Sequence, residues 1–429
     1  MTNGNGVWEH VFDTLPVLKE VQSAGQFFIS SAQLNSISKP LGGPDARNLV
    51  KYDHRVLLPP VFKQHGLSLL PIARGEFLIG PFKIYAPLPD DEVIPVRPLA
   101  VPEHLESLKT LSSETDALMA AYYGKAIDQV LGEEVLYTTA GKAGGPAFEM
   151  LVDTQGIPGP ARRINVRKGV SIEIDAIYEG PTVVAAFEAK MKSVVDFNIR
   201  QLYYPYRYLL ERHKKDVRTV FLTYSNEIFD VRVFRFEDEL NISSFSELAR
   251  WRFSRSKDAI LISDLLRLAE SAPKTRGIQN HFPFPQADSL ERVINLVEMV
   301  LQSLATKKEI ADSFGFHERQ ADYYANAAGY LGLIRRLAPG IWGPTALAQE
   351  IFSLNFRERN LSLAELVLAD KPFRETFLEA QRIGFLPGSD FVLRSLRASN
   401  PDSIMSGSTP GRRVGTILGW VRWLLALVA

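Results

Sequence analysis

The sequence predicts a mixed α/β core, in which helices flank a mixed sheet, between two terminal domains that are mostly helical. Two β-like runs, at residues 171–175 and 183–190, stand close together in the chain. A helical pattern at 196–212 and a further β-like run at 217–223 follow them. This order of elements predicts a mixed sheet flanked by helices. The segments before and after it carry helical periodicity and capping residues, which predict the helical terminal domains.

Two interruptions in the pattern divide the chain. The stretch 86–102 is rich in proline, and 272–288 combines proline, glycine and polar residues. We therefore expect three domains, at residues 1–98, 99–280 and 281–429.

Composition limits the class of protein. The chain has 429 residues, 46% of them hydrophobic, no cysteine and a formal net charge of +0. Disulfides and thiolate metal sites are excluded, which favours a cytoplasmic location. The apolar tail 417–429 contains Arg422 and falls short of the roughly 20 residues that span a bilayer, so we expect a docked terminal helix and no membrane partner.

Three charged side chains are predicted to converge in the core. Glu179-Gly180-Pro181 supplies turn residues between the two β-like runs, so a hairpin would bring Asp175 beside Glu188. Residues two apart in a strand point to the same side, so Lys190 shares that surface with Glu188. The run before Glu188 is almost wholly apolar, which indicates a buried strand whose charged end is unlike an ordinary solvated surface.

Two carboxylates and a lysine suit metal-dependent hydrolysis of a phosphodiester. Asp175 and Glu188 are candidate ligands for Mg²⁺, with Mn²⁺ as a substitute, and they leave coordination positions for water and a phosphate oxygen. Lys190 can stabilise developing negative charge or orient the attacking water. The same spacing also arises by chance in proteins without this chemistry.

The pattern D-x12-E-x-K, preceded by the apolar residues 183–187, resembles the catalytic core of the PD-(D/E)XK nucleases. The resemblance implies a strand, strand, helix, strand core in which Asp175 and Glu188 bind metal and Lys190 assists the nucleophile. Ile174 stands where the family name has proline.

Two further residues are candidates for catalytic support. Gln201 matches a glutamine that recurs early in the helix after the lysine in part of this superfamily, although Pro205 stands where a tyrosine is expected. Glu114, or Asp116, matches an upstream helical acid. Both acids would also complement the dipole at a helix start without any catalytic role.

Basic clusters surround the predicted core. Arg162, Arg163, Arg167 and Lys168 precede the first core strand, and further clusters lie at 212–218 and 250–257. Such clusters beside a phosphodiester-cleaving site would contact DNA phosphates, while each alone also suits a solvated face.

Residues 288–345 resemble a winged helix-turn-helix. An amphipathic helix is followed by a helix capped by Thr306, a turn at Gly315 and a second helix that runs from His317 to near Gly332. A helix in this position reads base edges in the major groove. The candidate DNA-facing residues are His317, Arg319, Gln320, Tyr323, Tyr324 and Asn326. Alternatively, the unit serves packing or dimerisation, with the tyrosines in its core.

The N-terminal region is similar in kind, with a capped helix predicted in 27–40. Its segment 51–80 looks like the leading region of a group of bacterial restriction endonucleases. The residues expected to face DNA are Arg47, Lys51, Arg55 and Arg74. Asp53 and Arg55 could instead form an internal ion pair.

We therefore expect a Type II restriction endonuclease that cuts double-stranded DNA with Mg²⁺, acts as a homodimer and has a companion DNA methyltransferase. A modification-dependent, repair or mobile-element nuclease is the nearest alternative, and a catalytically inactive winged-helix DNA-binding regulator is another. No P-loop, H-E-x-x-H or serine nucleophile motif is present, which argues against ATP-driven, zinc and serine hydrolase chemistry.

Overall fold

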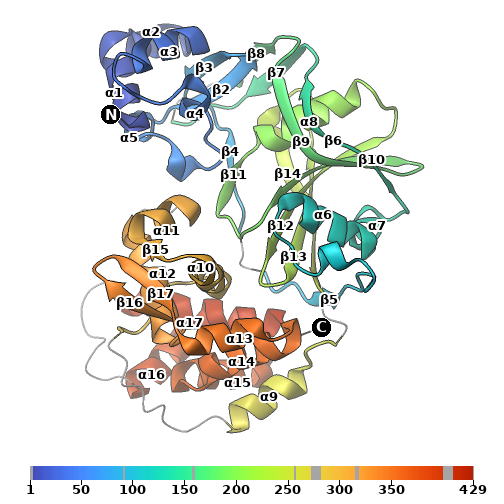
Figure 1. Ribbon diagram of the computed structural model, residues 1–429, viewed down its shortest axis with the longest axis vertical. Coiled ribbons are helices and arrows are strands. Elements are labelled where there is room, and N and C mark those ends of the chain that lie inside the picture. The colour runs from blue at the N-terminus through green and yellow to red at the C-terminus, as the bar shows by residue number, and fades with distance from the viewer. Residues whose placement is uncertain are drawn as a thin grey trace.

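A computed structural model describes residues 3–89, 92–156, 160–255, 258–271, 282–314, 318–399 and 409–428. The fold is mixed α/β with a seven-stranded mixed sheet, as the sequence predicts. Figure 1 shows an N-terminal part at one end of the molecule, a helical C-terminal part at the other and the large sheet between them.

The N-terminal part packs helices against a three-stranded antiparallel sheet of order β1-β3-β2 around the buried side chains of Trp8 and Phe62. The predicted capped helix is confirmed as α3, where Ser30 and Gln33 form a capping box. Residues 27–30 form strand β1 rather than helix, because they pair with β3. The elements are α1 Gly4–Thr14, α2 Val17–Ala24, β1 Phe27–Ser30, α3 Ser31–Ser38, α4 Ala46–Leu49, the short 3-10 helix η1 Arg55–Leu57, α5 Pro60–Gln64, β2 Ser68–Ala73 and β3 Glu76–Gly80.

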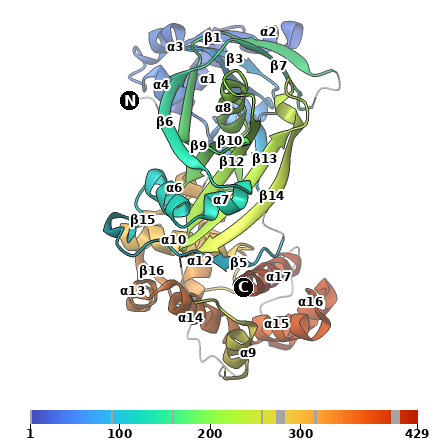
Figure 2. The ribbon, with the colours of Figure 1, turned by 90° about the vertical axis from the view of Figure 1, so that its right-hand side faces the viewer.

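The central sheet has the strand order β5-β14-β13-β12-β10-β9-β6. Figure 2 shows these strands running between the two terminal parts. Strands β10 and β12 are parallel and joined through α8, and β5 is parallel to β14. The strands are β5 Val96–Pro98, β6 Leu136–Gly144, β9 Ser171–Glu179, β10 Val183–Lys190, β12 Asp216–Ser225, β13 Ile228–Phe236 and β14 Phe245–Ser254.

Helices cover both faces of this sheet, which explains the apolar composition of β10. Val184 and Ala186 pack in the same cluster as Leu202 of α8, whereas Val183, Ala185 and Phe187 pack with α6 and α7. The helices are α6 Glu114–Tyr123, α7 Ala126–Leu131 and α8 Arg200–Leu210, with the 3-10 helices η2 Glu106–Leu108 and η3 Ile242–Ser244.

Two small ribbons accompany the sheet: β4 Tyr85–Pro87 pairs with β11 Asp196–Asn198, and β7 Phe148–Val152 pairs with β8 Arg162–Val166. The helix predicted from residue 196 begins only at Arg200, because the preceding residues pair with β4. Strands β4 and β5 lie within the span 1–98, yet they pair with β11 and β14 of the central part.

The C-terminal part is helical around a second three-stranded sheet. Its strand order, β15-β17-β16, is the same first, third, second order as in the N-terminal part. Leu265 of α9 packs into this core. The elements are α9 Ile262–Ser271, α10 Leu290–Gln302, β15 Ala305–Thr306, α11 Lys307–Phe314, α12 Glu318–Tyr330, β16 Ile334–Ala338, β17 Ile341–Pro344, α13 Ala346–Ser353, α14 Phe356–Leu368, α15 Lys371–Ile383, α16 Ser389–Ser399 and α17 Thr409–Ala426.

The predicted docked terminal helix is confirmed as α17, because Trp420 is fully buried and its indole N–H donates to the Ala287 carbonyl at 2.8 Å. Within the described ranges, no helix has the length and apolar character needed to cross a membrane.

Candidate active site

The β9–β10 hairpin places the two predicted metal-binding acids side by side. Antiparallel pairing extends to Ala176 opposite Phe187, so Asp175 and Glu188 are the next residues of the two strands. Asp175 is fixed by its Oδ2 atom, which accepts the backbone N–H of Ala189 at 2.8 Å. The hairpin predicted from the turn residues 179–181 is confirmed.

Four charged or polar side chains from three elements meet at the end of β10. The Nζ atom of Lys190 lies 2.5 Å from Glu188 Oε1 and 3.5 Å from Glu114 Oε1 of α6. Gln201 of α8 donates from Nε2 to the same Glu188 oxygen at 2.5 Å. The structure therefore brings Glu188 and Lys190 together with both candidate support residues, Gln201 and Glu114.

Asp116 has a different role. It forms a capping box with Ser113 at the start of α6, and its Oδ2 atom accepts from the backbone N–H groups of Ser112 and Ser113, each at 3.0 Å. Of the two upstream acids, Glu114 alone touches Lys190, while Asp116 caps the helix as the alternative interpretation expects.

Burial and charge set the protonation of this cluster. Glu188 is 6% exposed, and burial raises its pKa to about 7. Burial also raises the pKa of Asp175, against the hydrogen bond from Ala189 and the charge of Lys190. Burial alone would lower the pKa of Lys190, but the charges of Glu188 and Glu114 outweigh it and the pKa rises. The lysine is therefore charged, whereas burial favours the protonated forms of the two acids.

The donor set fits Mg²⁺. Asp175 and Glu188 offer carboxylate oxygens, and Mg²⁺ is commonly held by one or two carboxylates together with water and substrate phosphate. The Oε1 atom of Gln201 is buried and has no hydrogen-bond partner in the described part of the chain. Among the described residues, no group of three or more histidine or acidic side chains is arranged to hold a metal.

A cleft of about 520 Å³ opens over this cluster. Asp53 and His54 line it from the N-terminal part, Asp175 and Glu188 from the sheet, and Asp312 from α11 of the C-terminal part. Figure 1 shows the N-terminal part and α11 on the same side of the central sheet. The cleft thus lies where all three parts of the chain meet.

Three cations in the cleft have no ionic partner among the residues that the structure describes. Lys51, Lys192 and Arg200 line it, and none of them forms an ion pair with any described residue. Unpaired cations beside carboxylates match a phosphodiester bound next to a metal ion. The sequence prediction included Lys51 but missed Lys192 and Arg200. Lys192 continues the alternation of Glu188 and Lys190, and that signal could have identified it.

Most of the other predicted DNA-facing side chains have partners within the protein. Arg55 donates to Gln155 rather than pairing with Asp53, and Arg162 donates to the Ala24 carbonyl. Arg163 pairs with Glu149, Arg167 with Glu76, and Arg47 with Asp45, while Lys168 is exposed. Lys51 is the member of this set that lines the cleft.

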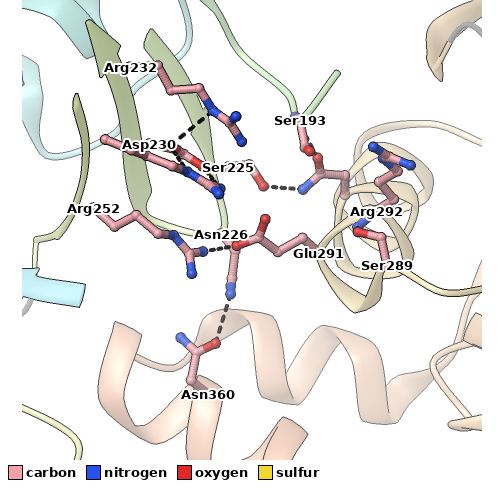
Figure 3. A network of polar contacts seen from close by, with 12 residues as sticks. Ser193, Ser225, Asn226, Asp230, Arg232, Arg252, Ser289, Glu291, Arg292 and Asn360 are labelled. Atoms are coloured by element: carbon pink, nitrogen blue, oxygen red, sulfur yellow. Dashed lines mark hydrogen bonds and ion pairs between the residues drawn. The ribbon is translucent and has the colours of Figure 1, made fainter. Parts of the chain in front are cut away.

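Two arginines of the basic cluster at 250–257 have buried side chains. Arg250 pairs with Asp230 and Arg252 with Glu291, and their side chains are 4% and 5% exposed. Figure 3 shows Arg252 and Glu291 in a polar network between the sheet and α10. The prediction that Arg250 and Arg252 contact DNA phosphates is therefore wrong, because Arg250 pairs within the sheet and Arg252 joins the sheet to α10.

The predicted reading helix corresponds to α12. Arg319 is exposed and donates to the hydroxyl of Tyr323 at 2.8 Å, and Asn326 is half-buried. Tyr324 belongs to the core, as the packing alternative expects, and Gln320 lines a second cavity between α10 and α17. His317 lies outside the described residues.

Three family models match the chain, each described only as a domain of unknown function: DUF6996 over residues 5–79, DUF6997 over 80–254 and DUF7226 over 292–429. The candidate cluster of Asp175, Glu188, Lys190 and Gln201 lies within the DUF6997 match. No curated protein and no solved structure matches the chain.

Proposed function

We propose that this protein is a Mg²⁺-dependent, sequence-specific endonuclease of the PD-(D/E)XK type that cuts both strands of DNA, in the manner of a Type II restriction enzyme. One observation carries the proposal. Asp175, Glu188 and Lys190 meet at the end of two paired strands, in a cleft that also contains three cations with no ion pair to any described residue.

Each residue has a role in this chemistry. Asp175 and Glu188 would hold the metal, and Gln201 orients Glu188 through its amide. When bound, Mg²⁺ supplies an acidified water and neutralises phosphate charge. Lys190 stabilises negative charge that develops on the phosphate, and Glu114 holds the lysine from the other side.

The terminal parts are proposed to bind the duplex. In the C-terminal part, the order α10, β15, α11, α12, β16 and β17 with sheet order β15-β17-β16 supports a winged helix, and the sheet order β1-β3-β2 supports a second one. Arg319 is exposed at the start of α12, where it can reach a base edge. A homodimer and a companion methyltransferase follow from the proposed restriction activity and rest on no contact in the structure.

Replacement of Lys190 tests the catalytic assignment. In Lys190→Ala, we expect plasmid cleavage with Mg²⁺ to fall by about 10² to 10³ or more, because charge stabilisation at the phosphate is lost. Binding of duplex DNA should remain. The control is Lys371→Ala on α15, which removes an exposed lysine paired only at the surface with Glu375. Full cleavage by Lys190→Ala would contradict the site assignment.

A DNA-binding regulator is the second candidate, favoured by the repeated strand order of the terminal parts. Wild-type protein that binds duplex DNA but cuts neither unmodified nor methylated plasmid with Mg²⁺ or Mn²⁺ would support it. Cutting of methylated plasmid alone would instead support a modification-dependent nuclease, and a methyltransferase gene beside this one would favour restriction.

A further inference from the structure

Lys192 lies beside the proposed catalytic residues but has no role in the proposed catalytic step. It stands two residues beyond Lys190 and four beyond Glu188, and it lines the same cleft. Its Nζ atom donates to the backbone carbonyl of Ser313, near the end of α11, and lies 3.4 Å from the Ser313 hydroxyl. A residue of the C-terminal part thus holds a lysine of the cleft.

The charge of Lys192 is not neutralised by these contacts. Both acceptors are uncharged atoms of Ser313, and Lys192 forms no ion pair with any described residue. Burial, and then the charge of Lys190, lowers the pKa of Lys192, and the charge of Glu114 offsets only part of this effect. An ammonium group has three donors, so the two contacts with Ser313 leave one donor for an anion.

A second contact fixes the backbone next to Lys192. The N–H of Ser193 donates to Oδ1 of Asn295 on α10 at 2.9 Å. Asn295 is 4% exposed, and its Nδ2 atom also contacts the Ser225 hydroxyl at the end of β12. Ser193 and Ser225 lie close together beside α10 in Figure 3. The segment that carries Lys192 is therefore held from α10 and α11 together.

We propose that Lys192 binds a nucleic-acid phosphate in the cleft and that α10 and α11 of the C-terminal part aim it there. The proposal rests on the proposed nuclease function and adds a phosphate contact to it. It also gives the C-terminal part a second task beside DNA recognition, because Asp312 of α11 lines the cleft and α10 and α11 hold the segment that carries Lys192.

The salt dependence of duplex binding tests the contact. Binding is measured without divalent metal, so that no strand is cut, over a series of KCl concentrations. Lys192→Met should weaken binding for all sequences and lower the slope of log affinity against log salt by about one, as for one lost phosphate contact. Lys192→Arg should restore the slope, and the surface control Lys371→Met should leave it unchanged.

Asn295→Leu tests the aiming, because it removes the acceptor for Ser193 and changes no charge. We expect Asn295→Leu to weaken duplex binding when Lys192 is present. When it is combined with Lys192→Met, we expect no further loss, so the two effects are not additive. Gln302→Leu, an exposed position at the end of the same helix, is the control. Thermal unfolding of each variant shows whether it folds, and the Lys192 series decides the contact even if Asn295→Leu does not.

The outcomes separate the two proposals. A wild-type protein that neither binds nor cuts duplex DNA overturns both. Normal cutting by wild type, with Lys192→Met behaving like Lys371→Met, overturns the role of Lys192 and leaves the nuclease in place. Additive losses in Asn295→Leu and Lys192→Met overturn the aiming by the C-terminal part.

Discussion

At the scale of single residues, the site is a pair of acids, Asp175 and Glu188, held by neutral and cationic donors. Glu188 has two partners on one oxygen, Lys190 and Gln201, while Asp175 is held by a backbone N–H. The residue spacing already predicted Asp175, Glu188 and Lys190 as neighbours, because strand alternation and one turn decide their sides. The contact of Gln201 with Glu188 depends on where α8 crosses the sheet, which the local pattern does not specify.

Gln201→Ala tests the role of this amide. Without its donor, Glu188 loses orientation, and we expect the Mg²⁺ concentration that gives half-maximal cleavage to rise by about 10- to 100-fold. Titration of plasmid cleavage with Mg²⁺ measures this change. Gln129→Ala on α7 is an exposed control. An unchanged Mg²⁺ requirement in Gln201→Ala would show that Gln201 contributes only to packing and does not orient Glu188.

At the scale of elements, α10 is the part that joins the sheet to the C-terminal helices. The β12–β13 turn presents Asn226 and Glu227, both with positive φ, to this helix and to α14. Asn226 donates its backbone N–H to Glu298 of α10 at 3.2 Å, and Glu227 pairs with Arg359 of α14 at 3.0 Å. A strained turn persists where such contacts over-determine it.

Glu298 makes this junction sensitive to pH. Burial raises its pKa to about 7, above the value near 4.5 of the unfolded chain. The folded state therefore keeps a proton that the unfolded state loses, so this contribution is full below about pH 4.5 and is lost as pH rises through 7. Because Glu298 is half-buried, we expect a loss of at most about 2 kcal/mol in the free energy of unfolding.

The variant Glu298→Gln should remove this part of the pH dependence. Urea unfolding at several pH values between 4.5 and 8 gives the comparison, with wild type losing stability relative to the variant as pH rises. A constant difference between the two proteins across this range would contradict the raised pKa.

At the scale of the whole molecule, one cleft is built from three parts of the chain. One chain offers one such cluster among its described residues, whereas cutting a duplex requires two strand cleavages. We therefore predict that two copies act together on a palindromic or near-palindromic site. Supercoiled plasmid should convert to the linear form without accumulation of nicked circles, and light scattering should detect a dimer on DNA. Accumulated nicked circles and a monomer would contradict this prediction.

The sequence by itself determined the local features: the β9–β10 hairpin, the strand β12 after a helix, the capped helix α3 and the docked helix α17. Each follows from periodicity, turn residues or caps within a short stretch. Local pattern misassigned residues 27–30 and 196–198 as helix, because their strand partners lie far away in the chain.

Only the tertiary structure decided which cations face the cleft. Arg250 and Arg252 stand in a sequence cluster that suits DNA as well as Lys51 does, yet they are buried against Asp230 and Glu291. Lys192 has no cluster around it, yet it reaches the cleft because α10 and α11 hold its segment. The physical reason is that the neighbours of a charged side chain decide whether it is paired and buried or faces the cleft. Those neighbours come from segments far away in the chain, which no local pattern encodes.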